Sequence, residues 1–374
     1  MDVAELMELA ADGLPVVSAA RAAGTETRSE QRPERQKEPL VEQGPEERQL
    51  SEESEALAKS MWRPLKSESC GEQISVVSFN MLLKGFDQKP YYPELPSTLR
   101  AWEWRKPQLV NLIYGMDADV YCMQEVECGT FAEEFSFLSP LYSAVPPKDD
   151  SKGKIPELAK CAIFFKTEKL QQIWHEHRSR VVLCALKHQT GQVIYFASCH
   201  LEGAPGEGRT RLTQLRKALQ SIRKHQEQSG FDPLNCAMVF AGDFNEDESG
   251  PIVRSLDLKP GDTVDETELF AHGLHLADLY DPKLGPFSQR PPTFGAPLAS
   301  GKAKLRAIDF VFYTCNTLSP VAVRAPLTVE QYEATIERSI PAEWHFSDHV
   351  PVGGIFQLSE SKPSQDVLAD VVIV

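Results

Sequence analysis

The 374-residue sequence lacks three features that would each indicate a particular class of protein. Its eight cysteines include no Cys-x-x-Cys pair, which argues against a zinc site or a disulfide framework. No apolar run approaches the roughly 18 residues that a membrane-spanning helix requires. Basic charge is also scarce: 39 Lys and Arg face 54 Asp and Glu, and the net charge of -15 argues against a simple electrostatic clamp on nucleic acid.

These absences favour a protein of the cell interior. The N-terminal stretch MDVAELMELAADGLP is acidic and has no basic region, so it resembles neither a secretory signal nor a transit peptide. Cys161, Cys199 and Cys236 lie within apolar runs, which is typical of buried free thiols in a reducing compartment. We therefore expect an intracellular protein, cytoplasmic or nuclear, without a membrane span. The sequence leaves its oligomeric state open.

Composition divides the chain into three parts. Residues 1–60 carry 14 Asp and Glu against 7 Lys and Arg and, after a short amphipathic helix predicted at 3–11, have almost no apolar content. We expect a disordered acidic tail there, and a docking segment for a protein partner is the alternative. Residues 61–360 show no linker and are predicted to form a single folded domain, followed by a C-terminal tail at 361–374.

The folded part contains many strand patterns and few long helices. Helices are predicted at 101–116, with Pro107 in the first turn, and between His200 and Cys236, where leucines recur on one face. This mixture favours an α/β sandwich over a doubly wound sheet, and the Pro- and Gly-rich stretch 285–306 is predicted to be a long loop. The predicted strands are 74–82, 117–127, 161–166, 180–188, 192–201, 236–245 and 307–314.

Polar side chains stand where several of these apolar strands end. Strand ends meet at one rim of a layered sheet, so residues far apart in sequence can meet there. Each residue alone could be a turn residue, a helix cap or a packed histidine, but their occurrence at successive strand ends is difficult to explain by independent turns. The residues are Asn80, Glu125, His200, Asp243 with Asn245, Asp309, and the pair Asp348 and His349.

The ordered motifs SFN, MQEVE, SCHL, GDFN, IDFVFY and SDH resemble the endonuclease/exonuclease/phosphatase superfamily over roughly residues 62–357. The stretches WEWRKPQLVNLI, CAIFFKTEKL and RLTQLRKAL are most similar to the branch of carbon catabolite repressor-type deadenylases, nocturnin and angel. The resemblance implies a four-layered α-β-β-α sandwich like deoxyribonuclease I, with two packed, mostly antiparallel sheets flanked by helices. It also implies hydrolysis of a phosphoester with Mg²⁺, for which Mn²⁺ is expected to substitute.

The resemblance implies a metal site centred on a carboxylate. Mg²⁺ prefers hard oxygen ligands and is usually held by one or two carboxylates together with substrate phosphate. Glu125 is the expected ligand. Asp348 or Asp309 would support it, or would instead fix the imidazole of His349.

The remaining motif positions imply a hydrolytic site. Asp243 would orient and deprotonate the attacking water, and the amide of Asn245 would hold that water or a phosphate oxygen. His200 and His349 would donate hydrogen bonds to phosphoryl oxygens as charge develops. Asn80 would position the metal-binding carboxylate or a phosphate.

The chain departs from the deadenylase pattern in two places. A small residue usually follows GDFN, whereas this chain has Glu246–Glu248, expected to alter the substrate side of the pocket or to face solvent. Deadenylases also carry an aromatic residue shortly before the IDFVFY-like strand, where it stacks on adenine. Here Lys304 and Arg306 stand in that region, suited to phosphate or simply solvated, and Phe294 would substitute only if its loop folds back.

Three classes of function therefore remain. The leading hypothesis is a Mg²⁺-dependent 3′-to-5′ exoribonuclease that acts on RNA tails. The second is a small-phosphate hydrolase, either a nocturnin-like dinucleotide phosphatase or an inositol or lipid phosphatase. The third is an inactive module that binds a partner through the acidic tail or the C-terminal DVVIV, although the complete set of acids and histidines argues against it. A phosphodiesterase that processes DNA ends is also open.

Overall fold

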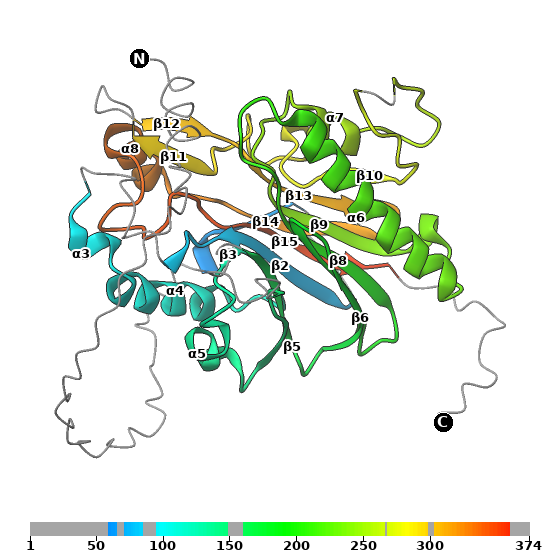
Figure 1. Cartoon of the computed structure of the whole chain (residues 1–374), viewed down its shortest axis with the longest axis horizontal. Helices are drawn as coiled ribbons and strands as arrows, with labels where there is room; N and C mark the ends of the chain where they lie inside the picture. Colours follow the sequence, from blue (N-terminus) through cyan, green and yellow to red (C-terminus); the bar gives the residue numbers. More distant parts are fainter. Residues whose placement is uncertain are drawn as a thin grey trace, which may run out of the picture.

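The computed structural model describes residues 59–65, 71–84, 95–148, 160–265, 268–297 and 303–359 (Figure 1). The predicted helix at 3–11, the C-terminal tail at 361–374 and nearly all of the acidic tail therefore lie outside the described residues. Two β-sheets pack face to face, and helices cover their outer faces.

The first sheet has seven strands. They are β1 (Trp62–Pro64), β2 (Gln73–Asn80), β3 (Val120–Val126), β4 (Tyr142–Val145), β5 (Lys160–Lys166), β14 (Leu318–Arg324) and β15 (Val352–Leu358). Their spatial order is β1-β14-β15-β2-β3-β5-β4. Strands β2 and β3 are parallel, with Asn80 opposite Gln124, whereas the other neighbours are antiparallel.

The second sheet has six strands. They are β6 (Leu170–His177), β7 (Val181–His188), β8 (Val193–His200), β9 (Ala237–Asp243), β10 (Leu276–Asp278) and β13 (Asp309–Thr314). Their order is β10-β13-β9-β8-β7-β6. Here too one central pair is parallel, β8 and β9, with His200 opposite Asp243. Both sheets are thus mostly antiparallel, as predicted.

Helices and a small hairpin complete the fold. The helices are α3 (Ser97–Arg100), α4 (Trp102–Met116), α5 (Phe131–Glu134), α6 (Gly208–Gln228), α7 (Pro251–Leu256) and α8 (Val329–Arg338), and the hairpin pairs β11 (Phe294–Pro297) with β12 (Ala303–Arg306). Figure 1 shows α4 and α5 beside the first sheet and α6 and α7 beside the second. The predicted α-β-β-α layering is confirmed.

Three apolar clusters hold these layers together. One lies between the sheets, where Val76 and Ile163 of the first sheet pack with Phe196 of the second. A second lies under α6, whose predicted stripe is buried, and a third lies under α4. Each fully buried Leu or Phe contributes roughly 1.5–3 kcal/mol, so the helices fix the sheets and hence the strand ends. The stripe of α6 comprises Leu212, Leu215, Leu219 and Ile222.

Several local predictions need correction. Pro107 lies within α4, beyond its first turn, because the helix begins at Trp102. The predicted loop 285–306 contains the hairpin β11–β12, which forms despite its prolines because it packs against α8 and His349. The burial of Cys161, Cys199 and Cys236 as free thiols is confirmed.

The two parallel pairs create the edge on which the site is built. Parallel neighbours end at the same edge of a sheet, so β2 and β3 end together, as do β8 and β9. The antiparallel strands β13 and β15 begin at that edge, since Asp309 pairs with Asp243 and Val352 pairs with Ser78. Six distant segments therefore meet along one rim.

Candidate active site

Asn80 lies at the centre of the rim and links two carboxylates. Its Nδ2 donates hydrogen bonds of 3.1 Å to Oε1 of Glu125 and 3.1 Å to Oδ2 of Asp243. Its Oδ1 accepts from the backbone N–H of Leu82 at 3.2 Å, which fixes the orientation of the amide. Asn80 is completely buried. The two carboxylates, one from each sheet, are therefore held in one cluster.

Glu125 stands at an irregularity of its strand. Its φ is 60°, and the pairing of β3 with β5 shifts register between Met123 and Val126. A non-glycine residue with positive φ is uncommon and marks a backbone held by its surroundings, often at functional sites. The other carboxylate oxygen, Oε2, accepts from the backbone N–H of Leu83 at 2.8 Å. The side chain is thus turned onto the rim.

Asp243 is almost fully buried and stands between two imidazoles. Its Oδ2 lies 3.6 Å from Nε2 of His200 and 3.6 Å from Nε2 of His349. Its Oδ1 accepts from the backbone N–H of Asn245 at 2.8 Å. The preceding Gly242 is required, because a Cβ there would lie 2.0 Å from the carbonyl oxygen of Cys199.

Asn245 closes the same turn with a left-handed backbone, at φ 53°. Its side-chain amide donates to the carbonyl oxygen of Leu201 at 2.9 Å, so the turn after β9 is tied to the end of β8. Nδ1 of His200 is buried and has no hydrogen-bond partner among the described residues. This ring nitrogen is therefore available to a water or a ligand at the rim.

His349 is oriented by Asp309. Its Nδ1 lies 2.9 Å from Oδ2 of Asp309, and both side chains are buried. Burial alone would lower the pKa of His349, but the charges of Asp309 and Asp243 outweigh it and raise that pKa well above its ordinary value. Burial also raises the pKa of Asp309, although His349 counteracts this. The ring therefore presents a donor at Nε2.

Asp348 is buried beside this pair. Its carbonyl oxygen accepts from the backbone N–H of Gly295 at 3.0 Å. Its charge is one of those that raise the pKa of His349. The structure thus associates Asp348 with the imidazole of His349 and with the hairpin. Its expected contribution to a metal site stays a prediction.

The donor atoms around Glu125 fit a hard cation. The carboxylates of Glu125 and Asp243 are both held by the amide of Asn80, and carboxylate oxygens are hard ligands. In the described part of the chain, no three His, Cys, Asp or Glu residues cluster as a metal cage. Mg²⁺ does not need one, because it retains waters and takes one or two carboxylates plus substrate oxygens. Glu125 is the residue that could hold it.

The hairpin β11–β12 folds back onto the site. The ring of Phe294 lies 4.9 Å from that of His349, inclined at 56°. Phe294 pairs with Arg306 and Ala296 pairs with Lys304, so both basic residues share the face of the hairpin that carries Phe294. The loop thus folds back, which was the condition for Phe294 to replace the aromatic residue of the deadenylases, and its role in stacking on a base stays a prediction.

The acidic run after GDFN has protein partners. Glu246 is buried, accepts from Nε of Arg211 at 2.9 Å and caps α7 through the backbone N–H of Ile252 at 2.5 Å. Glu248 lies 3.5 Å from Nε of Arg290. The expectation that Glu246 faces solvent is wrong, because it is buried and secures the turn after β9 to α6 and α7. The alternative that it alters the substrate side of the pocket stays a prediction.

Comparisons with known proteins agree with this geometry. No family model matches the chain. The Ccr4 protein of Debaryomyces hansenii, a CCR4-Not complex 3′-5′-exoribonuclease subunit, is 24% identical over 341 residues, which cover 78% of this chain and 40% of that protein. The chain thus spans about two-fifths of the length of this relative. Ccr4 of Candida albicans is also 24% identical, over 79% of this chain and 42% of that protein.

Solved structures extend the comparison to the fold. ANGEL2, a 2′,3′-cyclic phosphatase, matches with a TM-score of 0.62 at 21% identity and covers 79% of this chain and 97% of that chain. An endonuclease/exonuclease/phosphatase from Bacteroides vulgatus has a similar fold, with a TM-score of 0.50 at 18% identity over 77% of this chain and 100% of that chain. The human nocturnin catalytic domain also matches, with a TM-score of 0.58 at 18% identity over 80% of this chain and 96% of that chain. The resemblance to the Ccr4, nocturnin and angel branch of the superfamily is confirmed.

The superfamily motifs did not reveal the buried residues that support the segments of the rim. Arg105 is fully buried in α4 and donates to the carbonyl oxygens of Met81, Leu82 and Leu83, the segment whose N–H groups bind Asn80 and Glu125. The only signal for Arg105 was a basic residue within a helix that otherwise packs on the core.

Two hydroxyl groups were also missed. Oγ1 of Thr293 accepts from the backbone N–H groups of Ile308 and Asp309, at 3.1 and 3.0 Å. Oγ of Ser347 donates to the carbonyl oxygen of Asn80 at 2.8 Å. Both contacts join segments that are distant in sequence, so no local pattern marks them.

Proposed function

We propose that this chain is a divalent-metal-dependent phosphodiesterase, specifically a 3′-to-5′ exoribonuclease of the deadenylase type. The observation that carries the proposal is the set of donor groups that surround the carboxylate of Asp243. One oxygen of this buried carboxylate has an amide donor at 3.1 Å and two imidazole nitrogens at 3.6 Å, and Asn80 links it to Glu125.

This arrangement suits water attack on a phosphate. Asp243 is the base that orients the attacking water and removes its proton. His200 and His349 flank that carboxylate, so each offers Nε2 to a phosphoryl oxygen as negative charge develops. Asp309 holds the second imidazole in place through Nδ1. Removing one such donor from a hydrolytic site typically costs about 10²–10³ in rate.

Glu125 is the proposed ligand for the metal, and Asn80 and Leu83 hold its carboxylate in position. A bound divalent cation would polarise a phosphoryl oxygen and neutralise developing charge. In this proposal the pair of Asp309 and Asp348 serves the imidazole of His349, in agreement with their contacts and charges.

The choice of RNA rests on two supports. The Ccr4 proteins of D. hansenii and C. albicans are 3′-5′-exoribonuclease subunits, and the matches cover 78% and 79% of this chain. In the structure, Phe294 presents an aromatic ring beside His349, with two basic residues on the same face of the hairpin. A base stacked on such a ring gains roughly 1–3 kcal/mol.

A substrate panel tests the proposal. It compares 5′-labelled RNA with adenosine or uridine tails, RNA with a 2′,3′-cyclic phosphate end, single-stranded DNA, NADP and inositol phosphates, each with Mg²⁺ or EDTA. We expect stepwise shortening of RNA from its 3′ end with Mg²⁺ and none with Asp243→Asn. Phosphate release from the small substrates without RNA shortening would replace the nuclease with a phosphatase. Turnover of no substrate would leave an inactive binding module.

A further inference from the structure

A basic trough leads away from the catalytic rim. It consists of two adjoining cavities, of about 270 and 230 Å³, that share the wall formed by Arg178–Val181. The first is bordered by His200 and the second extends to α6. The cationic residues that define the basic trough are Lys148, Lys160, Arg178, Arg180 and Lys217.

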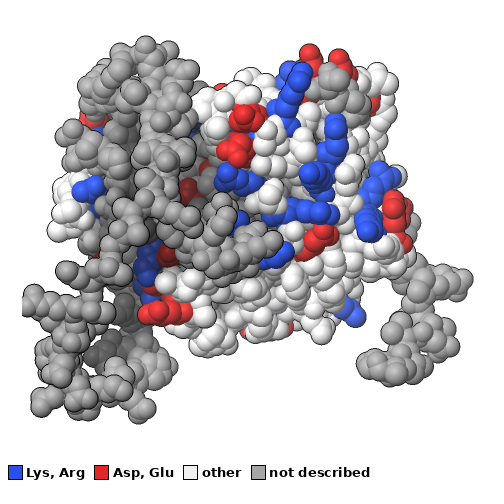
Figure 2. Space-filling view, in the orientation of Figure 1, with Lys and Arg blue, Asp and Glu red and all other residues white. Residues whose placement is uncertain are grey.

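The charge of the trough contrasts with that of the whole chain. None of the residues lining either cavity is Asp or Glu, although the protein carries a net charge of -15. Two acids behind the walls neutralise part of it: Glu202 lies 2.9 Å from Arg180, and Glu176 lies 2.6 Å from Arg178. Figure 2 shows Lys and Arg side chains gathered over α6 on the viewed face.

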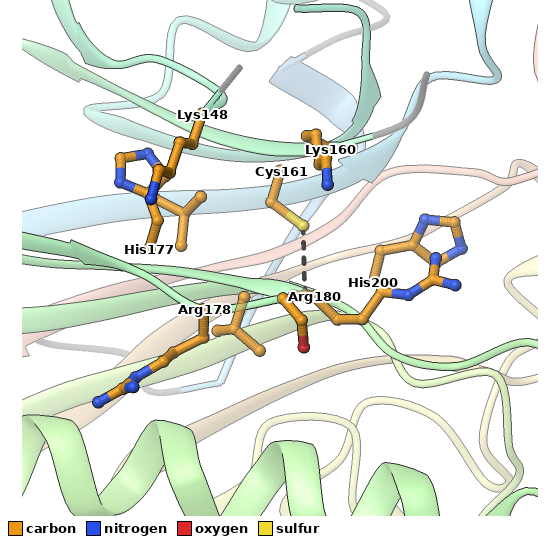
Figure 3. Close-up of a pocket in the computed structure, with 10 residues that line it drawn as sticks. Lys148, Lys160, Cys161, His177, Arg178, Arg180 and His200 are labelled. Atoms are coloured by element: carbon orange, nitrogen blue, oxygen red, sulfur yellow. Dashed lines mark hydrogen bonds between the residues drawn. The ribbon is translucent and has the colours of Figure 1, made fainter. Parts of the chain in front are cut away.

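The trough begins where the scissile phosphate is expected. His200 lines the first cavity, and its Nε2 lies 3.6 Å from Oδ2 of Asp243. The backbone N–H of His200 donates to the carbonyl oxygen of Arg180 at 3.0 Å, so the first cation of the trough is tied to the rim. Figure 3 shows Arg178 pointing from the cavity toward α6, where Ser221 accepts its hydrogen bond.

We propose that the basic trough binds the backbone phosphates of the RNA strand on the 5′ side of the scissile bond, an inference that rests on the proposed function. Hydrolysis there joins a water oxygen to phosphorus, breaks the bond from phosphorus to the upstream O3′ and leaves the proton on that oxygen. The released nucleotide keeps the scissile phosphate. Every further phosphate therefore belongs to the remaining strand, and cations beyond His200 can meet only that strand.

The shape of the trough favours a strand over a small polyphosphate. Its cations follow one another along two adjoining cavities, from Lys148 and Lys160 in the first to Lys217 on α6 in the second, and do not converge on one cavity. Spaced cations along a groove are how proteins follow a single-stranded backbone without reading its sequence. Arginine suits this role because its planar guanidinium binds phosphate oxygens in pairs.

Binding without cleavage tests the inference directly. Fluorescence anisotropy would measure the affinity of a labelled twelve-nucleotide oligoadenylate in EDTA across a series of salt concentrations. Each phosphate contact to a single strand contributes a slope of about -0.7 to the logarithm of affinity against the logarithm of salt. We expect Lys217→Gln and Arg180→Gln each to weaken binding and to reduce the slope by about that amount. Lys217→Arg and Arg180→Lys should restore it.

Lys187→Gln is the matched control. Lys187 is exposed on β7, the strand that begins at Val181 in the wall of the trough, but it lies near the opposite end of that strand and lines neither cavity. We expect this variant to bind like the wild type. Slopes that are the same in trough variants, control and wild type would overturn the inference.

Kinetics on two substrates separate this inference from the proposed function. The dinucleotide ApA has only its scissile phosphate, so the trough has nothing to bind. We expect the trough variants to lower the ratio of kcat/KM on the oligoadenylate to kcat/KM on ApA. An unchanged ratio would contradict phosphate binding by the trough without contradicting the proposed nuclease function. Binding of oligoadenylate through the trough without cleavage of any RNA would overturn the nuclease instead. If the trough variants lost affinity for inositol hexakisphosphate but not for the oligoadenylate, the trough would instead be a site for a small polyphosphate.

Discussion

Asp309 accepts a hydrogen bond of 2.9 Å from Nδ1 of His349, and the opposite ring nitrogen lies 3.6 Å from Asp243. The carboxylate of Asp309 thus fixes both the direction of the ring and its charge, because it helps to raise the pKa of His349 well above the ordinary value. Asp309→Asn keeps the size of the side chain and removes its charge. We expect kcat to fall by roughly 10²–10⁴ with little change in KM.

The pH profile distinguishes this role from a structural one. A raised pKa keeps His349 protonated through neutral pH, so activity declines only as pH rises through that pKa. In Asp309→Asn the pKa falls, and the alkaline limb of kcat should move to lower pH. Asp232→Asn, at an exposed cap of a short helix, should show neither effect. An unshifted alkaline limb in Asp309→Asn would contradict the orienting role.

Glu125 provides the next test, because its carboxylate is held in place by Asn80 and the N–H of Leu83. Glu125→Gln preserves the shape but removes the charge that attracts Mg²⁺. We expect turnover to fall by at least about 10³-fold and the Mg²⁺ concentration for half-maximal activity to rise, with an unchanged circular dichroism spectrum. Glu127→Gln, two residues on and bonded to Thr130, is the control. Wild-type Mg²⁺ dependence in Glu125→Gln would remove Glu125 from the metal site.

The choice of metal follows from the oxygen-rich rim. EDTA should abolish activity, and Mg²⁺ or Mn²⁺ should restore it, because both are hard cations that carboxylates suit. Metal analysis of the purified protein should find no stoichiometric zinc. Full activity in EDTA, or a zinc ion that survives dialysis, would contradict the proposed site.

The strand ends were predictable because they are local. Asn80, His200 and Asp243 each follow a continuous apolar run, so the sequence marks both the strand and the point where it stops. The parallel pairing of β2 with β3 and of β8 with β9, which brings these ends together, was not predicted, since a single sequence carries no record of which strands pair.

The features that the sequence did not predict depend mostly on contacts between distant residues. Glu246 meets Arg211 across 35 positions and Ser347 meets Asn80 across 267, so no local pattern could assign either partner. The hairpin in 285–306 was missed because its prolines disfavour a strand, whereas packing against α8 and His349 supplies the stability that local preference lacks. The start of α4 was predicted to within one residue, so the error lay in assigning Pro107, the sixth residue of the helix, to its first turn.

Substitutions of Phe294 distinguish two roles of its ring, stacking on a base and packing against His349. Its ring lies 4.9 Å from the imidazole, half-buried at the face of the hairpin. If a base stacks on the exposed face, Phe294→Ala should raise KM for adenosine-tailed RNA by roughly 5- to 150-fold, which corresponds to about 1–3 kcal/mol. Phe294→Tyr should retain most of the affinity. Phe137→Ala removes an equally half-buried ring beside Tyr114 and should leave KM unchanged. A fall in kcat alone would assign Phe294 to the support of His349.

Stability should depend on pH through Glu134, which anchors the start of α4 and the segment after β2. Its carboxylate accepts from Nε1 of Trp102 at 2.8 Å and pairs with Lys106 at 2.8 Å and Lys84 at 2.5 Å. Burial alone would raise its pKa, but the hydrogen bonds from Lys106, Lys84 and Trp102 outweigh it and lower the pKa to about 2. A depressed carboxyl pKa stabilises the fold above the unfolded value of about 4.3, and that contribution is lost as pH falls toward 2.

Glu134→Gln should therefore lower the free energy of unfolding near pH 7 by roughly 1–3 kcal/mol, since each unit of pKa shift is worth about 1.4 kcal/mol and solvent screens the ion pairs with the partly exposed Lys84 and Lys106. Urea denaturation at several pH values would show the gap between wild type and variant narrowing from about pH 4.5 downward and closing near pH 2. The exposed neighbour Glu133 supplies the control, because Glu133→Gln should leave the free energy of unfolding unchanged at every pH. A gap that stays constant down to pH 2 would mean that Glu134 stabilises α4 by packing, and its ion pairs with Lys84 and Lys106 would then contribute little.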